Sequence, residues 1–323
     1  MRAFGIESTA HTFGIGAVDL GKREVLANES VSYRPKEGII PAECARFLEE
    51  NAEIVLERAE KKLDLGKIDV IGVSQGPGLP PSLSFGLKFA KSLAERLCKP
   101  LIGVNHCRAH IEIARFLSSV REPVVLYVSG GNTQVIYADR RGNYRVLGET
   151  QDIGIGNAID KLGRAMGLKF PAGPKIEELA KKGDFVMLPY YVKGMDLNFS
   201  GILTDATRKF EKMAKSGPEK ARADISRSFQ EVSFAMLAEV TERAMAALNR
   251  KNLLLVGGVA QNMRLSEMLD IMCRERGAKF YAVAREYAGD NGAMIAASAA
   301  LEFKRSNTRA PEEIRPNWRI DAL

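Results

Sequence analysis

The sequence predicts an α/β protein that is built from two similar halves. Apolar strand-like segments alternate with amphipathic helical segments along most of the chain, an order that is typical of α/β layers. A strand–turn–strand unit near the N-terminus, AFGIESTAHTFGIGAVD, has a counterpart, PVVLYVSGGNTQVIYAD, that begins at residue 123. A repeat of this length exceeds the unit of a solenoid, so we expect two halves with a ligand cleft between them.

The first half is predicted to cover residues 1–120. Two strands, at residues 2–6 and 13–19, enclose a polar turn, and PAECARFLEENAEIVLERAEKKL follows. Its proline at the first turn and its apolar residues at three and four spacing predict an amphipathic helix. IDVIGVS and PLIGVN are short apolar strands, and the helical segment LSFGLKFAKSLAERL lies between them after a Gly/Pro loop.

The second half is predicted to cover residues 121–300. After the repeated unit, helices are expected at residues 154–166, 174–182 and 224–249. NLLLVGGVAQNMRLSEMLDIMCRERG contains an apolar strand, a double glycine and a helix; KFYAV is a further strand, and DNGAMIAASAALEF is an Ala-rich helix. We expect the polar tail, about residues 300–323, to pack back on the first half.

Composition narrows the classes of protein to which the chain can belong. Of its 323 residues 46% are apolar and 27% charged, which is ordinary for a soluble globular protein, and no apolar run has membrane-spanning length. Neither a secretory signal nor a C-x-x-C pair is visible, which predicts a cytoplasmic protein without membrane contact. The net charge of +7 is consistent with an acidic partner such as nucleic acid, and equally with a well-solubilised surface.

The stretch VNHCRAHIE contains two of the three histidines, His106 and His110, four positions apart. On a helix this spacing places both imidazoles on one face, where they can bind one metal ion. Two ordinary helix residues are the alternative, but the rarity of histidine favours a metal site. Cys107 stands where the metalloprotease motif H-E-x-x-H has its glutamate, which argues against a metallopeptidase.

Two glycine turns in the second half indicate a nucleotide site. Gly130 and Gly131 follow an apolar strand in YVSGGNTQ, where backbone N–H groups could approach an anion, although a tight hairpin turn explains this pair at least as well. Gly257 and Gly258 end a buried strand and precede a helix, yet neither G-x-G-x-x-G nor a Walker lysine is present. Together, the two turns predict a phosphate-and-base site.

Three acidic residues stand beside glycines or at a helix start, and each has an ordinary structural interpretation. Asp160 and Glu177 lie inside helix-like apolar patterns beside glycines, where they could hold a sugar hydroxyl. Solvated charges on a helix surface are the more common case. Asp290, in AGDNGAMIAA, stands where an ordinary helix N-cap is expected.

Eight motifs in a fixed order resemble one family: GPGLPPSLSFGLKFAKSLA, NHCRAHI, YVSGGNTQ, GNAIDKLGRAMGL, GPKIEELA, NFSGILTDA, GGVAQNMRL and DNGAMIA. It is the universal tRNA N6-adenosine threonylcarbamoyltransferase family, whose bacterial members are called TsaD and which was formerly labelled a glycoprotease family. The chain is most similar to the archaeal members, the catalytic subunits of the KEOPS complex. The family has the actin–hexokinase–Hsp70 (ASKHA) fold, and the resemblance runs from about residue 3 to 300.

The resemblance also implies roles for individual residues. It implies one metal ion per subunit, iron in many members with zinc as the alternative, bound by His106, His110, Tyr127 and Asp290. It implies a substrate or nucleotide site, for threonylcarbamoyl-AMP, ATP or an analogue, made by Tyr127, Val128, Ser129, Gly130, Gly131, Asp160, Gly173, Glu177, Gly257, Gly258 and Asn262. The chain departs from the family at Ala172, which replaces the first glycine of the usual GGP.

The implied activity is the transfer of a threonylcarbamoyl group to N6 of adenosine 37 in tRNAs that read ANN codons. No residue is assigned as general base. The implied partners are tRNA and the kinase-like and small accessory subunits of KEOPS, and nonspecific DNA binding is a further expectation from the charge. An ATP-binding DNA-repair protein and a small-molecule kinase on the same fold remain the alternatives.

Overall fold

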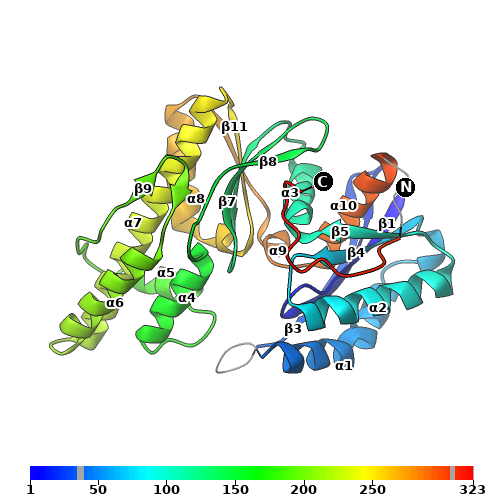
Figure 1. The fold of residues 1–323 in the computed structure, drawn as a ribbon, viewed down its shortest axis with the longest axis horizontal. Helices are drawn as coiled ribbons and strands as arrows, with labels where there is room; N and C mark the ends of the chain where they lie inside the picture. The colour runs from blue at the N-terminus through cyan, green and yellow to red at the C-terminus, as the bar shows by residue number, and fades with distance from the viewer. Residues whose placement is uncertain (35–39, 306–309, 323) are drawn as a thin grey trace. The chain divides into compact units, whose positions relative to one another are not determined.

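The computed structural model describes residues 1–34, 40–305 and 310–322. The chain divides into two compact units: Met1–Ser119 with Ala284–Leu323 form unit 1, and Val120–Val283 form unit 2. Each unit contains one mixed sheet with helices packed on it, as Figure 1 shows. The predicted α/β class is therefore confirmed. Among the described helices, none combines the length and the apolar composition that crossing a membrane requires.

Unit 1 has a five-stranded sheet in the order β3-β2-β1-β4-β5. β1, β2 and β3 form an antiparallel meander, whereas β4 and β5 run parallel to β1. Helices α1 and α2 pack on this sheet, and α3 packs against α10, which itself lies on β1, β2 and β4. The elements are β1 (Arg2–Glu7), β2 (Thr12–Asp19), β3 (Glu24–Ser32), α1 (Pro41–Glu60), η1 (Leu65–Lys67), β4 (Val70–Gly76), α2 (Pro80–Leu97), β5 (Leu101–Asn105), α3 (His106–Ser118), α9 (Arg285–Ala288) and α10 (Gly292–Arg305).

Unit 2 repeats the same sheet plan, in the order β12-β11-β6-β7-β8. Here β6, β7 and β8 form the meander, and β11 and β12 run parallel to β6. The two halves are thus alike in topology, as the repeated unit predicted. The elements are β6 (Val124–Val128), β7 (Thr133–Ala138), β8 (Tyr144–Glu149), α4 (Ile155–Ala165), α5 (Gly173–Ala180), β9 (Val192–Lys193), β10 (Asp196–Leu197), α6 (Ser200–Ala214), α7 (Pro218–Ala247), β11 (Asn252–Val256), η2 (Gly258–Gln261), α8 (Met263–Glu275) and β12 (Lys279–Ala282).

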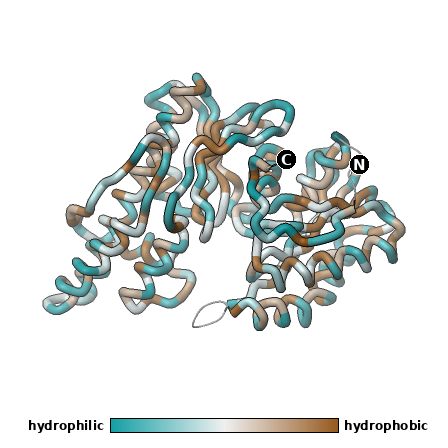
Figure 2. Tube along the Cα trace, viewed as in Figure 1, coloured by the Kyte–Doolittle hydropathy of each residue, from teal (hydrophilic) through white to brown (hydrophobic). Residues whose placement is uncertain are grey.

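Hydrophobic residues concentrate along the strands, with polar residues more frequent on the helices and turns (Figure 2). The buried side chains form separate clusters in the two units. In unit 2 the 30-residue helix α7 contributes to the core along most of its length, because apolar residues occur on more than one side of it. Each unit therefore has the core that an independent domain needs.

The predicted second half, residues 121–300, includes most of α10. In the structure this helix belongs to unit 1. Its contact with the sheet depends on glycine. A Cβ added to Gly292 would lie 2.1 Å from the backbone nitrogen of Gly16. A Cβ added to Gly5 would lie 2.2 Å from the backbone nitrogen of Ala296. Close approach of two backbones requires residues without a side chain. The Ala-rich sequence of α10 is therefore a packing surface for unit 1.

The C-terminal tail also lies on unit 1. The backbone nitrogen of Arg315 donates to the carbonyl of Gln75 at 2.8 Å. Further along, the Arg108 guanidinium donates to the carbonyl of Ile320 at 3.0 and 3.1 Å. These bonds join the tail to the end of β4 and to the helix that carries the histidines.

Glu302 on α10 provides a pH-dependent contribution to stability. Burial, reinforced by the nearby Glu112 carboxylate and opposed by Arg108, raises the pKa of Glu302 from 4.5 to about 7. Between these values the unfolded chain has released this proton and the folded chain retains it, so the free energy of unfolding falls as pH rises. We expect Glu302→Gln to be more stable than the parent at pH 8 by up to roughly 3 kcal/mol, and close to it at pH 4.

Urea unfolding at both pH values measures this difference, with Glu53→Gln, on the exposed side of α1, as the control. Equal pH profiles for the parent and Glu302→Gln would contradict the assignment.

Candidate metal and nucleotide sites

The two predicted histidines lie at the start of α3. The chain leaves the sheet at Asn105, whose side chain accepts a hydrogen bond from the backbone nitrogen of Arg108 at 3.1 Å and so caps the helix. His106 is the first helical residue and His110 lies one turn later, with their ring centroids 4.8 Å apart. Both are buried, 8% and 2% exposed. The sequence spacing therefore places both imidazoles in one site.

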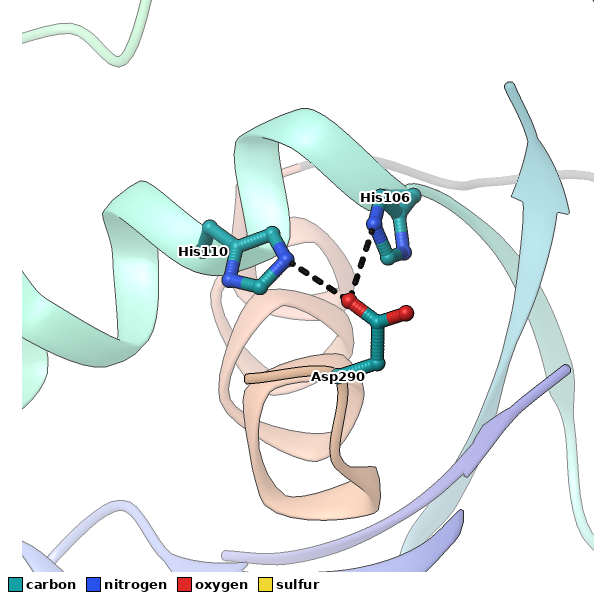
Figure 3. Close-up of side chains that lie close together, drawn as sticks. All are labelled: His106, His110 and Asp290. Carbon is teal, nitrogen blue, oxygen red and sulfur yellow. Dashed lines mark hydrogen bonds and ion pairs between the residues drawn. The ribbon is translucent and has the colours of Figure 1, made fainter. Parts of the chain in front are cut away.

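Asp290 completes a group of three ligand-type side chains within unit 1. Its Oδ1 lies 3.3 Å from Nε2 of His110 and 3.5 Å from Nε2 of His106 (Figure 3). One ligand atom from each residue lies within 4.8 Å of the other two. The side chain that caps α10 belongs to Asn291, which accepts from the backbone nitrogen of Met294 at 2.9 Å. Asp290 is therefore not the N-cap that its position suggested.

The charges of this group are mutually dependent. Burial alone would lower the pKa of His106, but the carboxylates of Glu7 and Asp290 outweigh it and raise that pKa to about 9. Burial lowers the pKa of His110 below its ordinary value of 6.5. The charge of His106 keeps the pKa of Asp290 well below its usual range, although burial opposes this effect. Two imidazole nitrogens and a carboxylate oxygen form a donor set that suits zinc or iron.

Two further residues, Glu7 and Thr9, also contact His106, and neither is among the residues predicted from the sequence. Nδ1 of His106 lies 3.1 Å from Glu7 Oε2 and 3.2 Å from Thr9 Oγ1. Glu7 is the last residue of β1 and Thr9 lies in the turn that follows, and both are buried. The signal in the sequence that could have indicated them is the run of polar residues at the end of an otherwise apolar strand.

The glycine turns of unit 2 lie beside each other. β6 and β11 are neighbouring parallel strands with Tyr127 opposite Val256, so the turns that follow them share one edge of the sheet. A Cβ on Gly257 would lie 2.3 Å from the carbonyl oxygen of Val128. Ligands of open α/β sheets bind beyond the carboxyl ends of parallel strands. The structure thus brings two separately predicted turns to one place.

The first of these turns is also a tight hairpin. The Ser129 backbone nitrogen donates to the carbonyl of Asn132 at 2.8 Å, and the Asn132 nitrogen donates to the Ser129 hydroxyl at 3.0 Å. The carbonyls of Ser129 and Gly130 accept from the backbone nitrogens of Gly156 and Asn157, in the first turn of α4, at 3.1 and 3.0 Å. The turn is therefore fixed to the helix that carries Asp160.

The predicted sugar- and base-binding residues are connected to the same region. Asp160 Oδ1 accepts from the backbone nitrogen of Ala172 at 2.7 Å, immediately before Gly173. Glu177 Oε1 accepts from the backbone nitrogen of Met263 at 3.0 Å, and the side chain of Asn262 caps the same helix, α8. One carboxylate oxygen of each acid thus has a structural partner. Tyr127, the fourth predicted metal ligand, is fully buried at the end of β6 in unit 2, and its metal role stays a prediction.

The chain is similar in sequence to a family of tRNA-modifying proteins. The family model described as "TsaD: tRNA N6-adenosine threonylcarbamoyltransferase" matches residues 23–297. A protein of that name from Archaeoglobus fulgidus is 53% identical, over 99% of this chain and 98% of its own length. A "Probable bifunctional tRNA threonylcarbamoyladenosine biosynthesis protein" from Thermoplasma acidophilum is 49% identical over the whole of this chain but only 60% of its own length.

Among solved structures, full-length HypF in its phosphate- and nucleotide-bound form aligns with a TM-score of 0.62 at 13% identity. The alignment covers 96% of this chain and 47% of HypF. At that identity the likeness concerns the fold alone, and it confirms the predicted ASKHA class.

Proposed function

This chain belongs to the tRNA N6-adenosine threonylcarbamoyltransferase family, and from that premise we propose that it moves the threonylcarbamoyl group of threonylcarbamoyl-AMP to N6 of adenosine 37 in tRNAs that read ANN codons. The group of two buried imidazoles, His106 and His110, with the partly buried carboxylate of Asp290 carries the proposal, because charged and polar side chains with no role in a site are mostly exposed. In this reaction N6 forms a bond to the carbamoyl carbon, the bond from that carbon to the phosphate oxygen breaks, and AMP leaves with the electron pair while N6 loses a proton.

The donor set fits a metal ion, one per subunit, which we propose to be iron with zinc as the alternative. His106, His110 and Asp290 would hold it, with Tyr127 as a further ligand. When bound, such an ion supplies a Lewis acid for a carbonyl oxygen of the threonylcarbamoyl group. The imidazoles are held for this role by the helix that carries them, and their burial keeps bulk water from the site.

The glycine turns would bind the adenylate. No described residue beyond the chain neighbours places an atom within 4 Å of a Cβ added to Gly131 or Gly258, so the backbone there is open to close approach. The backbone from Val128 to Gly131 would orient the phosphate, with backbone N–H groups as donors. Asp160, Gly173 and Glu177 would contact the sugar, and Asn262 the base.

Gly257 and Gly258 offer a matched pair of substitutions. Gly257 has a φ of +98° and no space for a Cβ, so Gly257→Ala is expected to cost roughly 2–3 kcal/mol of stability. Gly258→Ala should fold within about 0.5 kcal/mol of the parent but bind AMP about tenfold more weakly, because its methyl group occupies space proposed for the ligand. Thermal melts and calorimetric titration with AMP measure the two effects; unchanged AMP affinity in Gly258→Ala would contradict the placement of the nucleotide.

We propose that the chain works with tRNA and with a kinase-like protein and small subunits of a KEOPS-type complex in the cytoplasm. The net charge of +7 supports binding of the tRNA phosphates, and nonspecific DNA binding would follow from the same charge. The longer relative from Thermoplasma acidophilum supports the proposal of a protein partner. Its name describes it as bifunctional, and the match covers only 60% of its length.

The test incubates the purified chain with threonylcarbamoyl-AMP and tRNA, with and without the candidate partners, and analyses the nucleosides by mass spectrometry. We expect threonylcarbamoyl-adenosine in the parent tRNA and none in a tRNA with guanosine at position 37. Absence of product from every mixture, with metal bound, would contradict the proposal. Transfer of phosphate from ATP to a small acceptor without tRNA would instead support the kinase alternative.

A further inference from the structure

Glu7, the last residue of β1, places a fully buried carboxylate behind the metal-ligand group. Its Oε1 accepts from the backbone nitrogen of Thr9 at 2.8 Å and from the Thr9 hydroxyl. Its Oε2 lies 3.1 Å from Nδ1 of His106. Both oxygens are thus used, each in a different direction. A buried carboxylate is costly unless such hydrogen bonds compensate it, so its presence at this position requires an explanation.

The hydrogen bonds define one consistent arrangement of protons. An ionised carboxylate can only accept, and two donors from Thr9 converge on Oε1. With its proton directed at Glu7, the Thr9 hydroxyl oxygen is an acceptor 3.2 Å from Nδ1 of His106. Two acceptors therefore face Nδ1, which places the hydrogen of the neutral ring on that nitrogen. Nε2, on the opposite side of the ring, is left with its lone pair toward Asp290.

The segment that carries these residues is itself fixed. The backbone nitrogen of Ser8 donates to the hydroxyl of Ser74 at 2.8 Å, and the Ser8 hydroxyl donates to the carbonyl of Ser82 at 2.9 Å. The carbonyl of Thr9 accepts from the backbone nitrogen of Leu79 at 2.7 Å. The carboxylate therefore approaches His106 from a segment joined to β4 and α2, which limits its movement.

We propose that Glu7, oriented by Thr9, is a positioning residue that fixes the tautomer and ring orientation of His106, so that Nε2 is presented to a metal ion. This inference rests on the proposed metal site and adds residues that neither the spacing of the histidines nor the family motifs assign. Carboxylates behind metal-binding histidines set the tautomer and increase ligand basicity, and their loss typically costs 10–100-fold in metal affinity. Glu7 would have the same effect here through Nδ1.

Glu7→Gln tests the idea with almost no change in volume. The amide has one accepting oxygen, so it cannot accept from both Thr9 and His106. If its oxygen remains with Thr9, its NH₂ group donates to Nδ1 and moves the ring hydrogen to Nε2, where it blocks the metal. We expect Zn²⁺ affinity, measured by competition with a chelator, to fall by about 10–100-fold.

Thr9→Val should also lower Zn²⁺ affinity, whereas Thr9→Ser, which keeps the hydroxyl, should retain the parental affinity. Asp19 is a buried acid in β2 that contacts Arg2, and Asp19→Asn should leave Zn²⁺ affinity unchanged. The ¹⁵N spectrum of the histidine rings in metal-free protein, recorded at about pH 10 where His106 is neutral, gives a second readout. The parent should show His106 with hydrogen on Nδ1, and Glu7→Gln should not. A purely structural role for Glu7 would leave this tautomer unaffected.

A folded Glu7→Gln variant with Zn²⁺ affinity within about threefold of the parent would overturn the positioning role. If Glu7→Gln does not fold, a Zn²⁺ affinity of Thr9→Val within about threefold of the parent overturns the positioning role. His106→Ala and His110→Ala separate this failure from failure of the proposed function. If they bind Zn²⁺ as tightly as the parent, the metal site itself is wrong; if they lose it while Glu7→Gln retains it, only the positioning role is wrong.

Discussion

Replacement of Asp290 by alanine is expected to remove metal binding and to reduce tRNA modification by at least about a hundredfold, because loss of a ligand should cost no less than loss of a residue behind one. Oδ1 of Asp290 is the atom that Nε2 of both His106 and His110 face, at 3.5 and 3.3 Å. Without it two buried imidazoles remain, and the negative charge that offsets a cation on this side of the site is lost.

Metal content by mass spectrometry and the yield of modified nucleoside measure this effect together. His110→Ala should behave like Asp290→Ala, and Asp290→Asn should lose metal without a change of volume. Asp19→Asn is the control, because this buried carboxylate lies outside the group and contacts Arg2. Full metal occupancy and parental activity in Asp290→Asn would show that the carboxylate is not a ligand.

The candidate metal site was only partly predictable from residue spacing. His106 and His110 lie on one helix, so their separation in the sequence determines their separation in space. Asp290 lies 180 residues from His110, and a helix start made a cap its ordinary interpretation. Only the family motif assigned it correctly to this group, because no local rule relates residues that tertiary packing brings together. Glu7 was missed for the same reason.

The fold shows the same limit. The central strands and the repeated hairpin were predicted from their apolar patterns, but β3 and β8 were not. Each is the outer strand of a meander, and fewer of its residues are buried than in the strands beside it. An edge strand with polar residues resembles a loop in sequence. Helix α6 was also missed, although its buried Ile202, Ala206 and Phe210 have the spacing of a helix face.

The membership of α10 in unit 1 follows from contacts that composition does not reveal. An Ala-rich helix can pack on any close surface, and what selects this one is a pair of glycines in adjacent strands, Gly5 and Gly16. The same contact sets the position of Asp290, two residues before the helix begins. The packing of the fold and the geometry of the candidate metal site therefore depend on the same few atoms.

Gly292→Ala tests that dependence, and we expect it to reduce both stability and metal affinity. The added Cβ would lie 2.1 Å from the backbone nitrogen of Gly16 and 2.2 Å from the carbonyl carbon of Ile15. Because both are backbone atoms of β2, the helix has to withdraw, at a cost of roughly 3 kcal/mol or more. Asp290 moves with it, away from imidazoles that α3 holds in place.

Gly289→Ala is the matched control, because Gly289 stands next to Asp290 but has space for a side chain. No described residue beyond its chain neighbours places an atom within 4 Å of a Cβ added to Gly289. Gly289→Ala should keep the parental melting temperature and Zn²⁺ affinity, whereas Gly292→Ala should lower both. A destabilised Gly292→Ala with full Zn²⁺ affinity would separate packing from ligation and contradict the coupling. A parental melting temperature would contradict the close approach itself, because no rearrangement of side chains can make room for a methyl group between two backbones.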